Sequence, residues 1–369
     1  MWVRFPPSAS HLREQPELIK MSGVKVGVLT GGGDCPGLNA VIRAVARRSF
    51  SHGHEVVGVR EGWRGLVDGR FEPLGPREVS GLLPRGGTIL GTSRTNPYKL
   101  EGGVEDVRAN FEREGLDALV AIGGEDTLGV AASLFAELEF PVVGVPKTID
   151  NDLSGTDYTF GFDTAVSIAT EAIDRLHTTA ESHNRVMVVE VMGRHTGWIA
   201  VVSGIAGGAD MILIPEQPAT VEQACAELRR RHERGKDFSI AVVSEGYELT
   251  YESGERRTVA QEVELDAFGH VRLGGVGHEL GQEIENRTGY ETRVTVLGHV
   301  QRGGSPTPRD RVLATRFGLK AADLVEQERW GLMAALHGDA IEEVPIEEAT
   351  RELKQVPPAW YAVAEAFFG

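Results

Sequence analysis

The alternation of apolar and polar positions divides the chain into short β-branched runs and longer helical segments. Four runs in the first half have the length and composition of buried strands: residues 24–30, 55–60, 118–124 and 141–148. Apolar residues recur at helical spacing between these runs, over 38–50, 105–115 and 127–138. This strand–helix rhythm is typical of a parallel sheet that is covered by helices on both faces.

The same rhythm restarts after a helical pattern at about 163–182. Strand-like runs follow at 185–193, 210–216 and 238–246, with an amphipathic helix at 221–236. The pattern therefore predicts an α/β fold with two Rossmann-like three-layer domains and mostly parallel sheets. We expect the active site in the cleft between them, because ligands of such sheets bind beyond the carboxyl ends of the strands.

Composition excludes several classes of protein. The chain has 369 residues, of which 41% are hydrophobic and 25% charged, as in soluble globular proteins. We find no apolar run of about 18 residues, so we predict no membrane span. A net charge of −16 argues against nucleic acid, which is bound through clustered Lys and Arg. The two cysteines, Cys35 and Cys225, are too few for a disulfide framework and indicate a cytoplasmic location.

The first twenty residues differ in character from the rest of the chain. They carry prolines and mixed charges but no apolar segment of a secretory signal. The strand pattern begins at Val24, just after Met21. We therefore expect the domain to begin near Met21 and residues 1–20 to be a disordered leader or a translation-start artefact.

The first candidate motif is LTGGGDCPGLNAVIR, residues 29–43. A strand ends, three glycines follow, and a helix begins near Leu38. Backbone N–H groups at such a turn can form an anion-binding nest, to which a helix N-terminus adds partial positive charge. The motif matches neither GxGxxG nor GxxxxGK[ST]. A tight turn without a ligand is the structural alternative.

The second motif is VPKTIDNDLSGTD, residues 145–157. If this segment is extended, Asp150 and Asp152 point the same way. One carboxylate could then take a proton from a hydroxyl group while the other helps to hold Mg²⁺. The alternative is an Asx-turn or a helix cap, for which Asp and Asn are common.

The third and fourth motifs, VMGRHTGW (191–198) and VLGHVQRGGSPTPRDR (296–311), place cationic residues beside glycines after strands. Guanidinium groups match phosphate oxygens geometrically. The candidates for an anionic sugar phosphate are Arg94, Arg185, Arg194, Arg293, His299 and Arg302. An acidic protein repels such a substrate at long range, so binding requires a local cationic pocket. Each arginine alone is more often a solvated surface residue.

These four segments together resemble the 6-phosphofructokinase family, in the family's order from about Val24 to Arg311. The resemblance implies a phosphoryl-donor domain (22–161 plus about 301–350), a fructose 6-phosphate domain (162–300) and a C-terminal tail (351–369). It implies Asp150 as the base for the sugar 1-hydroxyl. Arg94 would neutralise charge on the transferring group, and Glu125 would hold Mg²⁺ with Asp152.

The resemblance also implies the contacts of the two substrates. The donor would lie against Gly32, Gly33, Asp126 and Lys147. The sugar phosphate would lie against Thr148, Ile149, Met192, Gly193, Arg194, Glu245, His299 and Arg302. Arg185 and Arg293 would reach across from a neighbouring subunit, which implies at least a homodimer; a homotetramer stays open.

The stretch AIGGEDT (121–127) bears on which of two phosphoryl donors, ATP or pyrophosphate, the protein uses. ATP-using members of the family typically have glycine where this chain has Asp126, and often where it has Lys147. Pyrophosphate-using members resemble this chain at both positions. An aspartate adds bulk and negative charge, so we expect room for two linked phosphates and none for a third that carries a nucleoside. The alternative is that Asp126 caps a helix and faces away.

The sequence thus predicts reversible phosphoryl transfer from pyrophosphate to the 1-hydroxyl of fructose 6-phosphate, in glycolysis or gluconeogenesis. Lys147 would help to offset the charge on the donor. Three alternatives remain: an ATP-dependent 6-phosphofructokinase, a nucleotide-binding dehydrogenase, which lacks its GxGxxG motif here, and a sugar-phosphate sensor, which has no need for Asp150.

Overall fold

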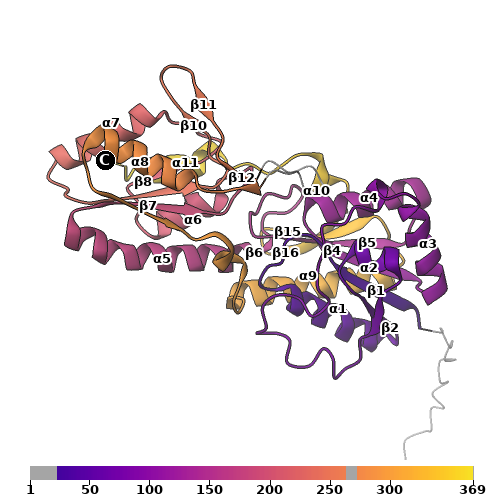
Figure 1. Ribbon diagram of the computed structural model, residues 1–369. Coiled ribbons are helices and arrows are strands. Elements are labelled where there is room, and N and C mark those ends of the chain that lie inside the picture. The colour runs from indigo at the N-terminus through magenta and orange to yellow at the C-terminus, as the bar shows by residue number, and fades with distance from the viewer. Residues whose placement is uncertain (1–22, 263–271, 369) are drawn as a thin grey trace, which may run out of the picture.

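Two sheets, each covered by helices on both faces, form two lobes that lie side by side in the computed structural model (Figure 1). The structure describes residues 23–262 and 272–368. The predicted leader at residues 1–20 lies outside this range. Among the described residues, no helix has the length and hydropathy needed to cross a membrane.

The first sheet has the order β16-β15-β5-β4-β1-β2-β3. Its strands are β1 (Lys25–Thr30), β2 (Glu55–Val59), β3 (Phe71–Pro73), β4 (Ala118–Gly123), β5 (Val142–Thr148), β15 (Leu332–His337) and β16 (Ala340–Pro345), and the short β6 (Phe160–Gly161) pairs with β5. The inner strands are parallel, whereas β3 and β16 are antiparallel edges. The chain thus returns to the first sheet after it has built the second.

Helices on both faces bury the first sheet. One face carries α1 (Leu38–His52) and α9 (Pro308–Glu326), and the other carries α2 (Trp63–Asp68), α3 (Gly103–Glu114) and α4 (Glu125–Leu138). In β1, Val26 and Val28 point to the first of these cores and Leu29 to the second. Side chains alternate between the faces of a strand, so burial on both faces explains the continuous apolar run.

The second sheet has the order β14-β7-β9-β8 and is parallel throughout. Its strands are β7 (Val186–Val191), β8 (Met211–Leu213), β9 (Ser239–Ser244) and β14 (Thr292–Val296). Helices α5 (Phe162–His183) and α6 (Trp198–Ala206) cover one face, and α7 (Val221–Glu233) and α8 (Val276–Thr288) the other. Two short pairs of antiparallel strands lie outside both sheets: β10 (Leu249–Thr250) with β11 (Arg256–Arg257), and β12 (Ala260–Glu262) with β13 (Arg272–Leu273).

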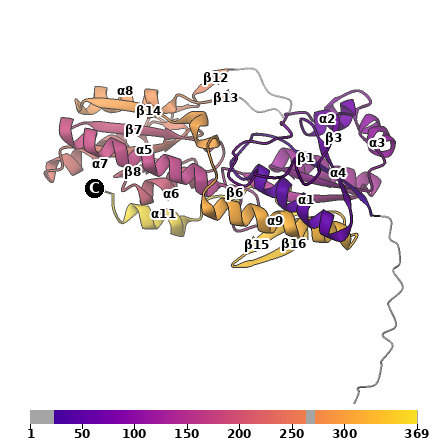
Figure 2. The ribbon, with the colours of Figure 1, turned by 90° about the horizontal axis from the view of Figure 1, so that it is seen from below.

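The C-terminal segment crosses from one lobe to the other. After β16 and the short α10 (Glu348–Arg351), the chain runs to α11 (Pro358–Glu365), which packs beside α6 (Figure 2). The hydroxyl of Tyr361 donates to the carbonyl of Ile212 in β8 at 2.9 Å. The end of the chain therefore contacts the second sheet.

The predicted fold class is confirmed: seven predicted strands correspond to β1, β2, β4, β5, β7, β8 and β9. The helices predicted at 38–50, 105–115, 127–138, 163–182 and 221–236 correspond to α1, α3, α4, α5 and α7. The prediction did not assign β14, β15 or β16. β16 alternates half-buried and exposed residues at a sheet edge, so it lacks the apolar run that marks a central strand.

The glycine at position 318 sets how closely α1 and α9 approach. A Cβ atom there would lie 2.7 Å from the Ala44 Cβ and 2.8 Å from the Val41 carbonyl oxygen. We predict that Gly318→Ala lowers the free energy of unfolding by about 1–3 kcal/mol, because the packed helices must move apart.

Gly129→Ala is the matched control, because Gly129 is also helical and its nearest neighbour would be 3.8 Å away. Alanine should raise helix stability there by up to about 1 kcal/mol. Denaturant unfolding of both variants measures the difference, and equal effects of the two substitutions would contradict the packing argument.

Candidate active site

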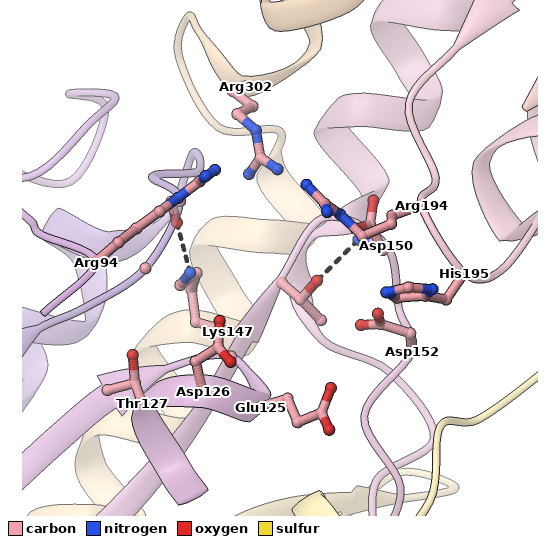
Figure 3. Close-up of a pocket in the computed structure, with 14 residues that line it drawn as sticks. Arg94, Glu125, Asp126, Thr127, Lys147, Asp150, Asp152, Arg194, His195 and Arg302 are labelled. Atoms are coloured by element: carbon pink, nitrogen blue, oxygen red, sulfur yellow. Dashed lines mark hydrogen bonds between the residues drawn. The ribbon is translucent and has the colours of Figure 1, made fainter. Parts of the chain in front are cut away.

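A cavity of about 130 Å³ lies where residues that follow strands of both sheets meet (Figure 3). Its lining residues are Gly32, Gly33, Arg94, Gly124, Glu125, Asp126, Thr127, Lys147, Thr148, Asp150, Asp152, Arg194, His195 and Arg302. Most of them follow β1, β4, β5 and β7 or belong to their last residues. The carboxyl ends of parallel strands thus form the site, as the sequence predicts.

The glycine loop after β1 approaches the cavity closely. A Cβ atom on Gly33 would lie 2.6 Å from a guanidinium nitrogen of Arg302, so a larger residue would displace that arginine. The expected anion nest is only partly present, because the amide of Gly31 donates to Ile122 and that of Gly32 to Ser93. Both donors are already engaged in holding the loop.

A different helix from the one predicted points its N-terminus at the cavity. Gly124 caps α4, and Glu125, Asp126 and Thr127 form its first turn on the cavity wall. The first residues of α1 do not line the cavity. The partial positive charge of a helix N-terminus stabilises nearby carboxylates, which explains how two adjacent acids are accommodated there.

Asp126 is not the helix cap, which is Gly124. Its half-buried side chain lines the cavity and lies beside Lys147 in Figure 3. The alternative of a capping aspartate that faces away is therefore wrong.

Lys147 lies near the end of β5 and is 3% exposed. Its Nζ donates to the Gly33 carbonyl oxygen at 2.5 Å, shown as a dashed line in Figure 3. Burial lowers the pKa of this ammonium group, and Arg302 lowers it further, while Asp34 and Asp150 oppose the shift. An incoming anion would favour the charged form of the lysine.

Asp150 and Asp152 both line the cavity, but not in the expected extended conformation. Asn151 between them has φ 53°, a left-handed conformation that asparagine tolerates better than most residues. The amide of Asp150 donates to the Thr148 hydroxyl at 3.0 Å. The turn, not an extended segment, brings the two carboxylates to one cavity.

The two carboxyl groups share a raised proton affinity. Burial raises the pKa of Asp150, against the lowering effect of Arg302 and Arg194. Burial and the neighbouring Asp150 raise the pKa of Asp152 to about 7. Among the described residues, none hydrogen-bonds to the buried Oδ1 of Asp150. A raised pKa and an unpaired oxygen suit a group that accepts a proton from a ligand.

Cations balance the acids of the cavity. Arg94, Arg194 and Arg302 extend toward its centre from three sides in Figure 3, and Lys147 is the fourth. The carboxylates are Glu125, Asp126, Asp150 and Asp152, so the two sets match four to four when His195 is neutral. The cavity is thus formally close to neutral in a chain of net charge −16, which differs from the cationic pocket expected from the sequence, and its four cations are the groups that can contact an anion.

Several candidates lie beside the cavity without lining it. Ile149 is fully buried and Met192 is 6% exposed, and the carbonyl of Gly193 accepts from the Ser244 hydroxyl at 2.6 Å. Burial, with Asp150 nearby, raises the pKa of Glu245 to about 7. His299 belongs to η2 (Gly298–Arg302), of which only Arg302 reaches the cavity.

Arg185 and Arg293 lie at the opposite end of the second sheet. Arg185 precedes β7, whereas Arg194 follows its carboxyl end, and Arg293 is the second residue of β14. Both form ion pairs with Glu291, at 2.7 and 2.5 Å. The structure does not bring them to this chain's own cavity.

Sequence reasoning missed His195, Thr127 and Gly124, which line the cavity. His195 follows Arg194 in the quoted motif, and Gly124 and Thr127 flank the two acids. Proximity in sequence to a chosen residue was the only available signal.

A second, more open cavity of about 340 Å³ adjoins the first. Glu125 and Asp126 line both. The others around it are Asn96, Tyr98, Gly129, Val130, Ser133 and Thr350. The expectation that no room exists beyond Asp126 is therefore wrong: the space exists, and Asp126 stands at its junction with the first cavity.

The carboxylates of the cavity supply some, but not all, of the ligands that a hard cation such as Mg²⁺ needs. Among the described residues, no group of three or more His, Cys, Asp or Glu side chains is arranged to hold a metal ion. Glu125 and Asp152 supply carboxylate oxygens, the ligands that Mg²⁺ prefers, and Mg²⁺ commonly takes one or two carboxylates together with substrate phosphates. The residues fit a cation that arrives with an anionic ligand.

Fold and site together define a two-lobed α/β protein in which one cavity brings four cationic side chains together with a buried carboxylate of raised pKa, groups that suit phosphoryl transfer. The chain belongs to the phosphofructokinase family, whose profile, described as Phosphofructokinase, matches residues 25–325.

Relatives with two different names match 94% of the chain. The pyrophosphate–fructose 6-phosphate 1-phosphotransferase of Amycolatopsis methanolica is 62% identical over 347 residues, covering 94% of this chain and 100% of that protein. The ATP-dependent 6-phosphofructokinase of Mycobacterium leprae is 53% identical over 348 residues, covering 94% and 100%. The crystal structure of a pyrophosphate-dependent phosphofructokinase from Marinobacter aquaeolei has a TM-score of 0.77 at 23% identity, covering 91% of this chain and 86% of that one, and shows the shared fold.

We predict that Lys147→Met weakens the binding of inorganic pyrophosphate with Mg²⁺ by about 10- to 100-fold, since a hydrogen bond to a charged group contributes about 1.5–3 kcal/mol. Isothermal titration calorimetry measures this. Lys99→Met is the control, because Lys99 is exposed on η1 (Pro97–Lys99). Equal affinities for the parent and Lys147→Met would remove Lys147 from the anion site.

Proposed function

We propose that this protein transfers a phosphoryl group from pyrophosphate to the 1-hydroxyl of fructose 6-phosphate, reversibly, giving fructose 1,6-bisphosphate and phosphate. The observation that supports it is one cavity that holds Asp126 and Lys147 on one side and Asp150 on the other. The relatives named pyrophosphate–fructose 6-phosphate 1-phosphotransferase at 59–62% identity agree with this choice.

Asp150 accepts the proton of the sugar hydroxyl in this mechanism. Its unpaired Oδ1 is the hydrogen-bond acceptor for that hydroxyl, and its raised pKa brings its proton affinity closer to that required of a base. Arg194 and Arg302, which flank Asp150, hold the sugar phosphate and favour the ionised base.

The donor lies on the side of the cavity formed by Gly33, Lys147 and Arg94. Lys147 and Arg94 offset negative charge on the phosphoryl oxygens as the bond to the leaving phosphate breaks. The Gly33 amide has no hydrogen-bond acceptor among the described residues, so it would be available to donate to an oxygen of pyrophosphate. Mg²⁺, held by Glu125, Asp152 and the donor itself, would supply further charge neutralisation when bound.

Donor choice in this proposal depends on charge at the cavity junction. Asp126 stands between the first cavity and the second. The α-phosphate of a nucleoside triphosphate, which carries the nucleoside, would therefore have to pass the Asp126 carboxylate. Like charges in close contact cost several kcal/mol. Pyrophosphate would not extend past the junction, and Lys147, which lies beside Asp126 in Figure 3, would offset the repulsion within the first cavity.

The second cavity is the observation that favours ATP as the alternative donor. Its volume of about 340 Å³ leaves room beyond Asp126, and relatives at 49–53% identity are named ATP-dependent 6-phosphofructokinase. Removal of one carboxylate would therefore be enough to open the path.

A second copy of the chain would complete the sugar site. Arg185 and Arg293 lie toward the amino ends of β7 and β14, about 20 Å and about 10 Å of strand away from the carboxyl ends of those strands. If they bind the sugar phosphate, it must be that of a neighbouring subunit, in a homodimer or homotetramer. We further propose that the enzyme acts in the cytoplasm.

We predict turnover with pyrophosphate, and little or none with ATP, in an assay of fructose 6-phosphate phosphorylation.

Asp126→Gly should raise kcat/KM for ATP at least about 10-fold, because removal of a like-charge contact is worth more than about 1.4 kcal/mol. Asp106→Gly is the control, since it removes an acid from the first turn of α3, away from the cavity. Turnover of the parent with ATP alone would reject pyrophosphate as donor.

We predict that Asp150→Asn lowers kcat by about 10²- to 10⁴-fold, the usual contribution of a general base. The Kd for fructose 6-phosphate should change less than about 3-fold, which separates loss of chemistry from loss of binding. Stopped-assay rates and calorimetry measure the two quantities. Asp174→Asn, at an exposed position of α5, should behave like the parent. Full activity of Asp150→Asn would mean that another group takes the proton.

A further inference from the structure

The C-terminal segment between α10 and α11 runs directly against the loop that carries the two cavity aspartates. The amide of Lys354 donates to the Asp152 carbonyl at 2.8 Å, and the Ser154 hydroxyl donates to the Glu352 carbonyl at 2.7 Å. Leu153 and Leu353 form an antiparallel bridge. We call residues 352–356 the strap. It pairs with the loop although about 200 residues separate them in the sequence.

The side chain of Lys354 anchors the strap below the turn. Its Nζ donates to the Asn151 side-chain oxygen at 3.1 Å, the Thr156 carbonyl at 2.9 Å and the Asp157 carbonyl at 3.0 Å. An ammonium group has three donors, and all three are used. The same nitrogen lies 5.7 Å from the centre of the Trp198 ring. Lys354 does not line the cavity.

Asn151 is the point at which this anchor acts on the site. It is 2% exposed and adopts φ 53°, a conformation that a non-glycine residue keeps only when its surroundings hold it. Its side-chain oxygen accepts from the Thr159 amide at 3.1 Å as well as from Lys354. Since Asp150 and Asp152 are its neighbours in the chain, the Asn151 conformation sets the backbone positions from which both carboxylates extend.

The strap is tied to the second lobe as well. The indole of Trp198 donates to the Lys354 carbonyl at 2.7 Å, and the amide of Val356 donates to Glu216 at 3.1 Å. Glu216 also accepts from the Gly197 amide at 3.0 Å. Gly197 and Trp198 begin α6, directly after the loop of Arg194. One segment therefore joins the loop of the proton acceptor to the loop of an anion-binding arginine.

We propose that Lys354 is a positioning residue for phosphoryl transfer: its ammonium group holds Asn151 in the left-handed conformation and thereby aims Asp150 at the substrate hydroxyl. The inference rests on the proposed function for its kinetic consequence. Without the ammonium group, the Asn151 oxygen and two loop carbonyls lose their shared donor, and the turn can relax into conformations that point Asp150 away from the substrate.

The test compares Lys354→Met, which keeps the length of the side chain and removes its donors, with Lys320→Met. Lys320 pairs with Glu343 on the outside of α9, and its loss should leave kcat unchanged. For Lys354→Met we expect kcat to fall at least about 10-fold, because misplacement by about 1 Å can cost 10²-fold. KM for fructose 6-phosphate should change less than about 3-fold, since the arginines stay in place.

Hydrogen exchange gives a readout that does not depend on activity. Lys354→Met should speed amide exchange over residues 150–159, where the Thr159 amide bonds to Asn151, and leave β4 and β7 protected. Faster exchange throughout the chain would overturn the proposal, because Lys354 would then support the fold and not this loop. Unchanged exchange together with unchanged kcat would overturn it as well.

The double variant Asn151→Gly with Lys354→Met tests whether the lysine acts through Asn151. Glycine accepts a positive φ, so the single Asn151→Gly variant removes the side-chain acceptor without backbone strain. We expect its kcat to fall, and kcat of the double variant to lie within about 3-fold of the lower single value, because coupled residues are not additive. Multiplied losses would contradict the proposal. If Lys354→Met does not fold, the Asn151→Gly variant alone decides. A kcat and an amide exchange rate over residues 150–159 that both equal those of the parent would refute the proposal.

The experiments distinguish failure of the proposed function from failure of the positioning role of Lys354. A parent protein that turns over neither donor would reject the phosphotransferase assignment, while the exchange data would still decide whether Lys354 holds the loop. A parent that is active beside an equally active Lys354→Met variant would reject only the positioning role.

Discussion

Four cationic side chains and four carboxylates surround one cavity in this protein. Both lobes contribute to this set of charges, so the fold must hold them close together. Neither set is stable alone in a poorly solvated space, because partly buried like charges repel and isolated buried charges lose hydration. The strand ends supply the fixed points: Lys147 from β5, the acids from α4 after β4, and Arg194 after β7. Burial is the largest cause of the raised pKa of Asp150 and Asp152 and of the lowered pKa of Lys147.

The sequence was sufficient for features that depend on local pattern. Burial on both faces produced the apolar runs of β1, β5 and β7, and the cavity residues Lys147, Asp150 and Arg194 lie at or just after strand ends. Features that depend on distant contacts were not predictable. The left-handed turn at Asn151 requires Thr159 and Lys354, the amides of Gly31 and Gly32 are engaged by residues from other segments, and nothing in the local sequence indicates that α4, not α1, points at the cavity.

The second cavity changes the physical account of donor choice. Space beyond Asp126 means that exclusion by volume alone would fail, whereas a carboxylate at the junction acts by charge on any anion that passes it. A tenfold preference needs only about 1.4 kcal/mol, well within the cost of a like-charge contact. The small size of this difference is consistent with the two donor names carried by relatives that are 50–62% identical to this chain.

The connection between the lobes also affects how the loops of Asp150 and Arg194 keep their relative positions. Asp150 follows β5 of the first sheet and Arg194 follows β7 of the second, so motion between the lobes would change the distance between these two side chains. The strap contacts both loops within three residues, through Lys354 and Val356, and α11 then fixes its far end to β8. A short segment that is held on both sides couples the two loops, in addition to the Thr196 hydroxyl, which donates to the Asp150 carbonyl at 3.5 Å. In the proposed mechanism, the positions of the reacting groups thus depend on residues 352–356, about 200 residues away in sequence from the loop that they contact.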